Sequence, residues 1–417
     1  MPAMSLIVQK FGGTSLADAP KIHRAARRAI RAKLDGHRLV LVVSAMGRST
    51  DELLHLADAV CPSDPPKREL DMLLTTGEQV SIALMAMAIH AAGHEAISLT
   101  AAQLGLFTDS VHSRARIQRI SRDRIDRELS AGKIVIVAGF QGIDATGEIT
   151  TMGRGASDTT ATALAAVLGA DACEIYTDVD GVYTADPRIV PQARKISRIS
   201  YDVMLEMAAT GAAVMHSPAI EFAKNFNVPV HVRSSLTDVE GTMITEETPD
   251  MQAVAVRGAT LKEDLAVVSL LGVPNAPGLA ARIFAEVARS HILVDDIVQN
   301  IYDGGKLAEL SFSTNAGDAR QAQAICQRLA GELGIRDVQV DNGVSKVSAI
   351  GVGMRSHTGI AATMFEALAA AEINIQNIST SEIVISCIVR RGDGPKALRF
   401  IHDAFKLDQQ KSAPASG

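Results

Sequence analysis

Hydrophobic and polar positions follow two different periods along roughly the first 245 residues of the chain. Short apolar, β-rich runs predict strands at Ser5–Val8, Leu39–Ser44, Ala96–Leu99, Ile134–Phe140 and Ala172–Thr177. Between these runs, apolar residues recur at helical spacing and predict helices at Ala19–Leu34, Gly77–Ala92 and Asp158–Leu168. Strands that alternate with helices are typical of an α/β fold, so we expect an αβα sandwich with a mainly parallel sheet.

The rest of the chain repeats itself at an offset of about 80 residues. The segment Gly272–Asn300 resembles Gly351–Thr380, with Phe284 matching Phe365 and Ile297 matching Ile378. Each copy predicts strand, glycine-containing turn, helix, strand, strand and helix, the order of a ferredoxin-like βαββαβ unit. We therefore expect a first domain at residues 1–247 and two such units at residues 264–340 and 343–408.

The second copy offers no fourth strand, because its last predicted helix, at about Gly394–Phe405, leads directly into a polar tail. Residues 253–259, with the sequence AVAVRGA, precede the first copy and belong to no other predicted element. We expect this strand to cross over and complete the second unit's sheet, and residues 409–417 to form a disordered tail.

Length and composition restrict the class of protein. A chain of 417 residues exceeds the size at which one core keeps growing, so two or three domains are expected. A net charge of -6 gives no basic surface for nucleic acid. The N-terminus lacks a leader pattern, and the longest apolar runs, such as Ala83–Ile89, are too short to cross a bilayer, so we expect a cytoplasmic protein without a membrane partner.

Cysteine spacing argues against a metal site. Cys61, Cys173, Cys326 and Cys387 lie far apart, with no CxxC pair and no histidine at zinc-ligand spacing. Buried free thiols are the expected state, and no protein-held metal is predicted.

Candidate chemistry begins where the first strand ends, in the segment IVQKFGGTS. Gly12 and Gly13 allow backbone N–H groups to approach an anion closely, and Lys10 supplies a positive charge. The alternative is a simple Gly-Gly turn beside a surface lysine. The segment has neither the P-loop spacing nor the dinucleotide GxGxxG spacing, so neither of those nucleotide-binding classes fits.

Several motifs occur together in a recognisable order: KFGGTS, VSAMG, TTGEQ, GFQG, GRGASD, YTDVDGVYTADPR and the paired C-terminal repeats. With this set the chain resembles the aspartate kinases of the amino acid kinase family over nearly its whole length, and its repeats resemble ACT domains. The resemblance implies an ATP-dependent phosphotransferase with a carboxyl acceptor. It would transfer the γ-phosphoryl of MgATP to the β-carboxylate of L-aspartate and give 4-phospho-L-aspartate, the first step of lysine, threonine and methionine biosynthesis.

The resemblance also implies a site for aspartate, formed by Ser44, Thr50, Glu78, Arg154 and Ser157. A guanidinium suits a substrate carboxylate and an acid suits the ammonium, which fits Arg154 and Glu78. Taken alone, Glu78 could equally be an acid favoured by the dipole in the first turn of a helix.

On the nucleotide side the resemblance implies Lys10, Gly12, Gly13, Thr177, Asp178, Tyr183, Arg188, Arg233 and Ser234. In isolation, the loop after Thr177 would be interpreted as a surface loop rich in turn residues. An aspartate carboxylate is ionised at neutral pH, so the reaction needs no general base. Catalysis would consist of positioning and charge neutralisation by Lys10, the two glycine amides and Mg²⁺, with Asp158 orienting Lys10 or binding the metal's water shell.

The ACT resemblance implies effector contacts in both repeats, at Pro277, Gly278, Asp295, Gln299, Asn300, Met354, Asn374, Ile375, Thr380, Ser381 and Glu382. Each of these residues could alternatively cap a helix or end a strand. Lysine, threonine or both are the expected effectors, acting through ACT pairing in a homo-oligomer. Translation from Met243 or Met251 would yield a shorter regulatory subunit.

Three positions depart from the family pattern. Ala156 replaces a second glycine in GRGASD, Ala213 stands where a lysine is usual, next to an uncommon MHSP segment, and Leu293 replaces an asparagine. These departures leave two alternatives open: a catalytically impaired amino-acid sensor, and a kinase for another small carboxylate such as glutamate.

Overall fold

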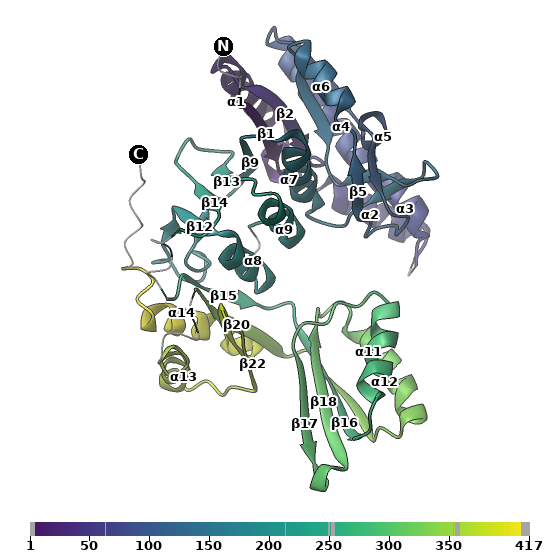
Figure 1. Cartoon of the computed structure of the whole chain (residues 1–417), viewed down its shortest axis with the longest axis vertical. Helices are drawn as coiled ribbons and strands as arrows, with labels where there is room; N and C mark the ends of the chain where they lie inside the picture. The colour runs from purple at the N-terminus through teal and green to yellow at the C-terminus, as the bar shows by residue number, and fades with distance from the viewer. Residues whose placement is uncertain are drawn as a thin grey trace.

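The computed structural model describes residues 5–62, 64–212, 214–248, 251, 255–352, 354 and 359–409. Its N-terminal domain is built on a twisted eight-stranded sheet (Figure 1). In order across the sheet, the strands are β12 (Arg198–Ser200), β14 (Thr242–Thr245), β13 (Val230–Ser234), β9 (Ala172–Thr177), β1 (Leu6–Phe11), β2 (Arg38–Val43), β6 (Ile134–Ala138) and β3 (Ala96–Leu99). Neighbouring strands are parallel except β13 and β14, which pair antiparallel.

Helices cover both faces of this sheet. Helices α1 (Ala19–Leu34) and α4 (Thr76–Ala91) pack on one face, against a core that includes Phe11, Leu41 and Ile136. The other face is covered by α6 (Asp123–Ser130), α7 (Ala156–Leu168), α8 (Tyr201–Ala209) and α9 (Ser217–Asn225). This arrangement confirms the predicted αβα sandwich with its mainly parallel sheet.

Smaller elements lie along the edge at β3 and β6. A four-stranded sheet has the order β5 (Ile117–Ile120), β4 (Leu106–Thr108), β7 (Gln141–Ile143) and β8 (Ile149–Thr151). The remaining elements of the domain are η1 (Gly13–Leu16), α2 (Ser49–Val60), α3 (Lys67–Leu74), α5 (Ala101–Leu104), β10 (Val182–Tyr183) and β11 (Lys195–Ile196).

Helices α3 and α4 follow each other closely. By length and composition alone, the stretch Lys67–Ala91 could cross a membrane, which differs from the expectation drawn from the longest apolar runs. However, 56% of its apolar window is buried inside the fold, and Ile82, Met85 and Ile89 belong to the core under the sheet. This burial is the pattern of a core helix in a globular domain.

The C-terminal half forms two sandwiches of helices on antiparallel sheets (Figure 1). The first contains β16 (Ala266–Pro274), α11 (Leu279–Arg289), β17 (Ile297–Tyr302), η2 (Asp303–Gly305), β18 (Leu307–Thr314), α12 (Ala319–Leu333) and β19 (Asp337–Asp341). The second contains β20 (Val344–Ile350), α13 (Ile360–Ala370), β21 (Asn377–Thr380), β22 (Val384–Arg390), η3 (Arg391–Asp393) and α14 (Gly394–Ala404). Their sheet orders are β17-β18-β16-β19 and β15-β20-β22-β21.

Strand β15 (Gly258–Lys262) precedes the first unit in sequence but pairs antiparallel with β20 of the second. The register runs from Gly258 opposite Ile350 to Lys262 opposite Lys346. It occupies the sheet position that β19 holds in the first unit. Part of the strand expected at residues 253–259 lies outside the described residues, as do Ser356, His357 and Thr358, the tail after residue 409, and Ala213.

The second unit also contacts the loop that follows β9. Ala185 and Val190 of that loop share a core cluster with the second unit's helices and strands. The Thr184 carbonyl accepts a hydrogen bond from Ala259 N (2.7 Å), and its hydroxyl lies 3.0 Å from Nε2 of His402 on α14. The N-terminal domain and the second unit therefore share part of one hydrophobic core.

The cysteines are free. Cys173, Cys326 and Cys387 are buried, whereas Cys61 is only half-buried, so the expectation of burial was wrong for that residue. Burial raises the pKa of the Cys326 thiol to about 11. Within the described ranges, no three His, Cys, Asp or Glu side chains are grouped so that they could hold a metal ion.

Candidate active site

Four adjacent parallel strands, β9, β1, β2 and β6, end at the same edge of the main sheet. The last residues of these strands and the loops that follow them include Thr177, Lys10 to Gly13, Ser44 and Gly139. In open α/β sheets, ligands bind outside the carboxyl ends of the strands. The topology therefore brings most of the candidate residues to one edge, although they are spread over about 170 positions of sequence.

Lys10 near the end of β1 is held by Asp158 in the first turn of α7. Lys10 Nζ lies 2.6 Å from Asp158 Oδ1, and the two side chains are only 11% and 8% exposed. Such a shielded, charge-assisted pair has a well-defined geometry. Asp158 therefore fixes the direction in which the Lys10 ammonium points.

The two glycines after β1 have different roles. The Gly12 N–H donates to the Tyr176 carbonyl (3.1 Å), so it is already used and is not free to meet a phosphate, contrary to our expectation. A side chain at Gly13 would place a Cβ 2.8 Å from the Ala45 carbonyl oxygen, which excludes any larger residue there. Gly13 thus allows the loops after β1 and β2 to touch.

Glu78 in the first turn of α4 is a buried acid. Its side chain accepts a hydrogen bond at Oε1 from Ala45 N (3.0 Å), and the residue is 3% exposed. Its other oxygen, Oε2, has no hydrogen-bond partner among the described residues. Burial raises the pKa of Glu78 to about 7. An acid with one unused oxygen in a shielded place is suited to binding a cation.

Ser44 lies in the same loop as Ala45. Its N–H donates to the Phe11 carbonyl (3.1 Å), which keeps the loop after β2 beside the end of β1. Lys10 on β1, Ser44 on the loop after β2 and Glu78 on α4 therefore belong to segments that are hydrogen-bonded or packed to one another.

Arg154 lies between Gly153 and Gly155, whose φ angles are +88° and +80°. Its guanidinium forms an ion pair with Asp51 (Nη2 to Oδ1, 2.6 Å) and is 70% exposed. The hydrogen bond and charge of Arg154 lower the pKa of Asp51. Because Asp51 follows Thr50, the pair brings Arg154 to the start of α2. Sequence reasoning missed Asp51, for which an acid beside Thr50 was the only available signal.

The turn leads into α7, whose first residues face the end of β6. Ala156 is the first residue of α7 and does not have a positive φ, so replacing glycine there costs no backbone strain. Ser157 is buried against Gly139, where an added Cβ would lie 2.6 Å from Ser157 Oγ. Gly139, in the GFQG motif, is therefore a structural requirement that sequence reasoning did not assign.

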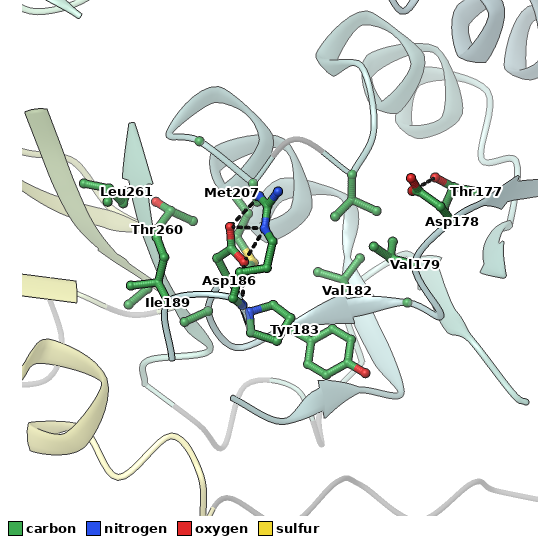
Figure 2. A pocket seen from close by; sticks show the side chains of 18 of the residues that line it. Thr177, Asp178, Val179, Val182, Tyr183, Asp186, Ile189, Met207, Thr260 and Leu261 are labelled. Atoms are coloured by element: carbon green, nitrogen blue, oxygen red, sulfur yellow. Dashed lines mark hydrogen bonds and ion pairs between the residues drawn. The ribbon is translucent and has the colours of Figure 1, made fainter. Parts of the chain in front are cut away.

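A pocket of about 610 Å³ opens beside these loops (Figure 2). Four predicted nucleotide residues line it: Thr177, Asp178, Tyr183 and Arg188. Arg188 forms an ion pair with Asp186 (2.7 Å), drawn in Figure 2. Other parts of the wall come from α8, from the loop after it, and from Ala259 to Leu261 of β15. The second unit's edge strand thus forms part of the pocket.

Arg233 and Ser234, also predicted on the nucleotide side, are not among the residues that line this pocket. Arg233 pairs with the largely buried Glu174 (Nη1 to Oε1, 2.8 Å) and lies over the Tyr176 ring. Tyr176 also donates to Glu174 (2.9 Å). Ser234 Oγ accepts from the N–H groups of Leu236 and Thr237. Both residues therefore have structural partners of their own.

The predicted effector residues lie on separate parts of the two C-terminal units. Gln299 and Asn300 are exposed on β17, and Thr380 is exposed at the end of β21. Pro277 and Gly278 precede α11, while Asn374, Ile375, Ser381 and Glu382 flank β21. Both β17 and β21 are edge strands of their sheets.

Two predicted effector residues have structural partners instead. Asp295 pairs with Lys346 of β20 (2.6 Å), and Lys346 also pairs with Asp296 at the same distance. Met354 is buried, and its N–H donates to the Glu382 carbonyl (3.2 Å). The Asp295–Lys346 pair links the first unit to the second.

Comparison with known proteins agrees with this geometry. The profile of the amino acid kinase family matches residues 5–234, and that of an ACT domain matches residues 347–405. The aspartokinase of Bacillus sp. (strain MGA3) is 48% identical over 404 residues, which cover 97% of this chain and 98% of that protein. Aspartokinase 2 of Bacillus subtilis is 48% identical over 410 residues, 98% of this chain and all of that protein.

Among solved structures, E. coli aspartokinase III in complex with aspartate and ADP, in its R-state, superposes with a TM-score of 0.85 at 25% identity. The superposition covers 96% of this chain and 99% of that one. The same enzyme in complex with lysine and aspartate, in its T-state, gives a TM-score of 0.73 over 96% of this chain and 99% of that one, also at 25% identity. The chain belongs to the amino acid kinase family and, within it, to the aspartokinases.

Proposed function

We propose that this aspartate kinase binds its amino-acid substrate between Glu78 and Arg154. The observation that carries the proposal is the buried Glu78 carboxyl, whose Oε2 has no partner among the described residues. An α-ammonium supplies the missing donors, and Arg154 supplies a guanidinium for a carboxylate. Ser44 on the loop after β2, Thr50 at the start of α2 and Ser157 at the start of α7 add hydroxyl groups to the site.

ATP binds beside aspartate, in the pocket lined by Thr177, Asp178, Tyr183 and Arg188. Lys10 and the Gly13 amide face its transferring phosphoryl group. The related E. coli enzyme was solved with aspartate and ADP, which supports two adjoining subsites at this edge of the sheet. Arg233 and Ser234 contribute only through the strand that they belong to, since both have structural partners.

Magnesium enters with ATP as part of the substrate. Magnesium commonly keeps several waters and few protein ligands, so it would be held mostly by phosphate oxygens and water. When bound, Mg²⁺ neutralises charge on the phosphates.

The residues of the chain contribute by positioning the two substrates and by offsetting charge. The β-carboxylate of aspartate attacks the γ-phosphorus of ATP, and ADP leaves. No proton has to be removed from this nucleophile at neutral pH. Lys10, held by Asp158, offsets the negative charge that builds up as the two anions meet.

The two ACT units bind lysine, threonine or both, at sites that adjoin the edge strands β17 and β21. These strands lie in different sheets, so we propose that ACT units of two chains associate to bring the effector residues together. The related E. coli T-state structure contains lysine. A homo-oligomer in the cytoplasm, with a shorter regulatory subunit made from Met243 or Met251, completes the proposal.

Aspartate-dependent ADP release tests this function. We expect turnover with aspartate and none with glutamate or N-acetylglutamate, and lower rates when lysine or threonine is added at subsaturating aspartate. Turnover with glutamate alone would indicate a kinase for another carboxylate. Absence of turnover with every acceptor, together with tight binding of lysine or threonine, would indicate a sensor.

A further inference from the structure

His216 lies in the MHSP segment, just before α9, and contacts the start of α7 at three points. Its ring packs on Gly155, where an added Cβ would lie 3.3 Å from the imidazole carbons. Its Nδ1 lies 3.2 Å from Thr159 Oγ1. Its backbone N–H points at Asp158 Oδ2 (3.4 Å). Helices α7 and α9 pack side by side, which keeps the histidine in place (Figure 1).

These contacts surround the turn that carries Arg154. Gly155 has a φ of +80° and follows Arg154 directly. The ring of His216 packs on Gly155, so it lies against the backbone from which the Arg154 side chain extends. The Arg154 side chain is 70% exposed and forms its ion pair with Asp51. The position of this side chain must therefore depend mainly on how tightly neighbouring residues pack around the turn. A displacement of about 1 Å at a substrate-positioning group can cost around 100-fold in rate.

The charges around His216 favour a neutral ring. Burial lowers the pKa of His216 most strongly, Asp158 on α7 opposes this, and Lys10 on β1 lowers the pKa further. A neutral imidazole leaves Asp158 paired with Lys10, because it does not compete as a second cation. The ring can therefore hold Thr159 and Gly155 without disturbing the phosphoryl side of the site.

We propose that His216 is a positioning residue for aspartate binding: through Gly155 and Thr159 it fixes the turn that presents Arg154 to the substrate carboxylate. The proposal rests on the assignment of Arg154 to aspartate made above. It predicts an effect on aspartate binding that is separable from ATP binding and from the phosphoryl-transfer step, since the backbone contact to Asp158 survives a change of side chain.

The test compares His216→Ala with His216→Asn, because the asparagine amide lies where Nδ1 of the ring lies. In His216→Ala we expect KM for aspartate to rise about 5- to 20-fold, while kcat and KM for ATP stay within about twofold. His216→Asn should recover KM to within about threefold of the parent enzyme. A loss spread equally over kcat and both KM values, or an asparagine variant no better than alanine, would overturn the proposal.

Thr159→Val reaches the same hydrogen bond from the other side and serves even if the histidine variants fold poorly. We expect it to raise KM for aspartate, and we expect the double variant with His216→Ala to be no worse than His216→Ala alone. Additive effects would mean that the two side chains act independently and would contradict the proposal.

Two controls separate the possible failures. His231→Asn changes another half-buried histidine, on β13, whose pKa is also lowered by burial, and should leave KM for aspartate unchanged. Arg154→Ala tests the assignment beneath the proposal. If Arg154→Ala leaves KM for aspartate unchanged, the proposed aspartate site is wrong. If only the His216 and Thr159 variants leave it unchanged, the site stands and the role of His216 is wrong.

Discussion

Glu78 is the residue at which local structure and chemistry meet most directly. The helix dipole favours a negative charge at its position in the first turn of α4. The fold nevertheless buries the carboxyl, and burial raises its pKa to about 7. In the proposed site the ammonium of aspartate would bind the ionised carboxylate, which predominates in the free enzyme only above that pKa. We therefore expect kcat/KM for aspartate to fall as the pH decreases through about 7, and Glu78→Gln to lose this dependence together with roughly 10- to 100-fold of kcat/KM.

Measuring kcat/KM for aspartate between pH 5.5 and 9 checks this expectation. A profile for the parent enzyme that is flat through pH 7 would show that Glu78 does not hold the ammonium. Because KM for ATP does not involve this carboxylate, its pH dependence provides the internal control.

The same acid affects stability, with a definite sign. The folded-state pKa of Glu78 lies above its ordinary value of 4.5, so its contribution to stability is complete below pH 4.5 and is lost as the pH rises through 7. Replacing Glu78 by a neutral residue should therefore increase the stability of the fold at high pH, where the buried carboxyl would be charged. We expect Glu78→Gln to raise the free energy of unfolding by on the order of 1–3 kcal/mol at pH 8.5 relative to its effect at pH 5. Denaturant unfolding at the two pH values measures this difference, and an equal effect at both would contradict it.

Asp51 pairs with Arg154 before any substrate is bound. A substrate carboxylate that binds the same guanidinium has to compete with Asp51. We expect Asp51→Asn to lower KM for aspartate by about two- to fivefold, the range for an exposed ion pair, without changing KM for ATP. Steady-state kinetics measure the change, and Glu52→Gln, at an exposed acid in the first turn of α2, is the control. A higher KM would mean that Asp51 orients Arg154 rather than competing for it.

At the scale of elements, β15 serves two structures at once. It is the edge strand of the second ACT unit and part of the wall of the proposed nucleotide pocket. The Thr184 hydroxyl accepts from Arg194 N (3.0 Å) and also lies within hydrogen-bond distance of Nε2 of His402 on α14 (3.0 Å). Thr184 thereby joins the nucleotide loop to the ACT helix as well as to β15.

Changes at this junction should weaken the binding of ATP more than the binding of aspartate. We expect His402→Leu, which removes a hydrogen-bond partner of the buried Thr184 hydroxyl, to raise KM for ATP about 3- to 10-fold. His402→Gln keeps a side chain that can donate or accept a hydrogen bond, and its effect should be milder. Kinetics with each substrate varied in turn measure the effect; a change confined to KM for aspartate would show that the contact does not act on the nucleotide loop.

At the scale of the whole molecule, the ACT units present apolar edges. Ile297 and Ile301 on β17 and Ile378 on β21 are more than 45% exposed, and their strands have unpaired outer sides. If this edge pairs with the same edge of a second chain, an aspartate at position 301 of each chain would place two negative charges near one another, and these would repel. We expect Ile301→Asp to shift the enzyme toward monomer and to remove its response to lysine or threonine while basal turnover remains. Light scattering and inhibition curves measure both, and Ile301→Val is the matched control. A variant that stays oligomeric and inhibited would exclude this edge.

The sequence by itself determined the local elements and the order of motifs. Periodicity predicted five of the eight strands of the main sheet (β1, β2, β3, β6 and β9) and helices α1, α4 and α7, because a buried apolar face has the same spacing wherever it packs. The candidates Lys10, Glu78 and Arg154 came from motifs that resemble those of the family.

The tertiary structure decided which polar groups remain available to bind a ligand. It used the Gly12 N–H and the Arg233 guanidinium in internal contacts, it buried Glu78 enough to raise its pKa, and it paired Arg154 with Asp51. It also placed His216 against Gly155. Partners and burial depend on residues far away in the chain, and these become neighbours only when the sheet and the ACT units are assembled. No local pattern records them.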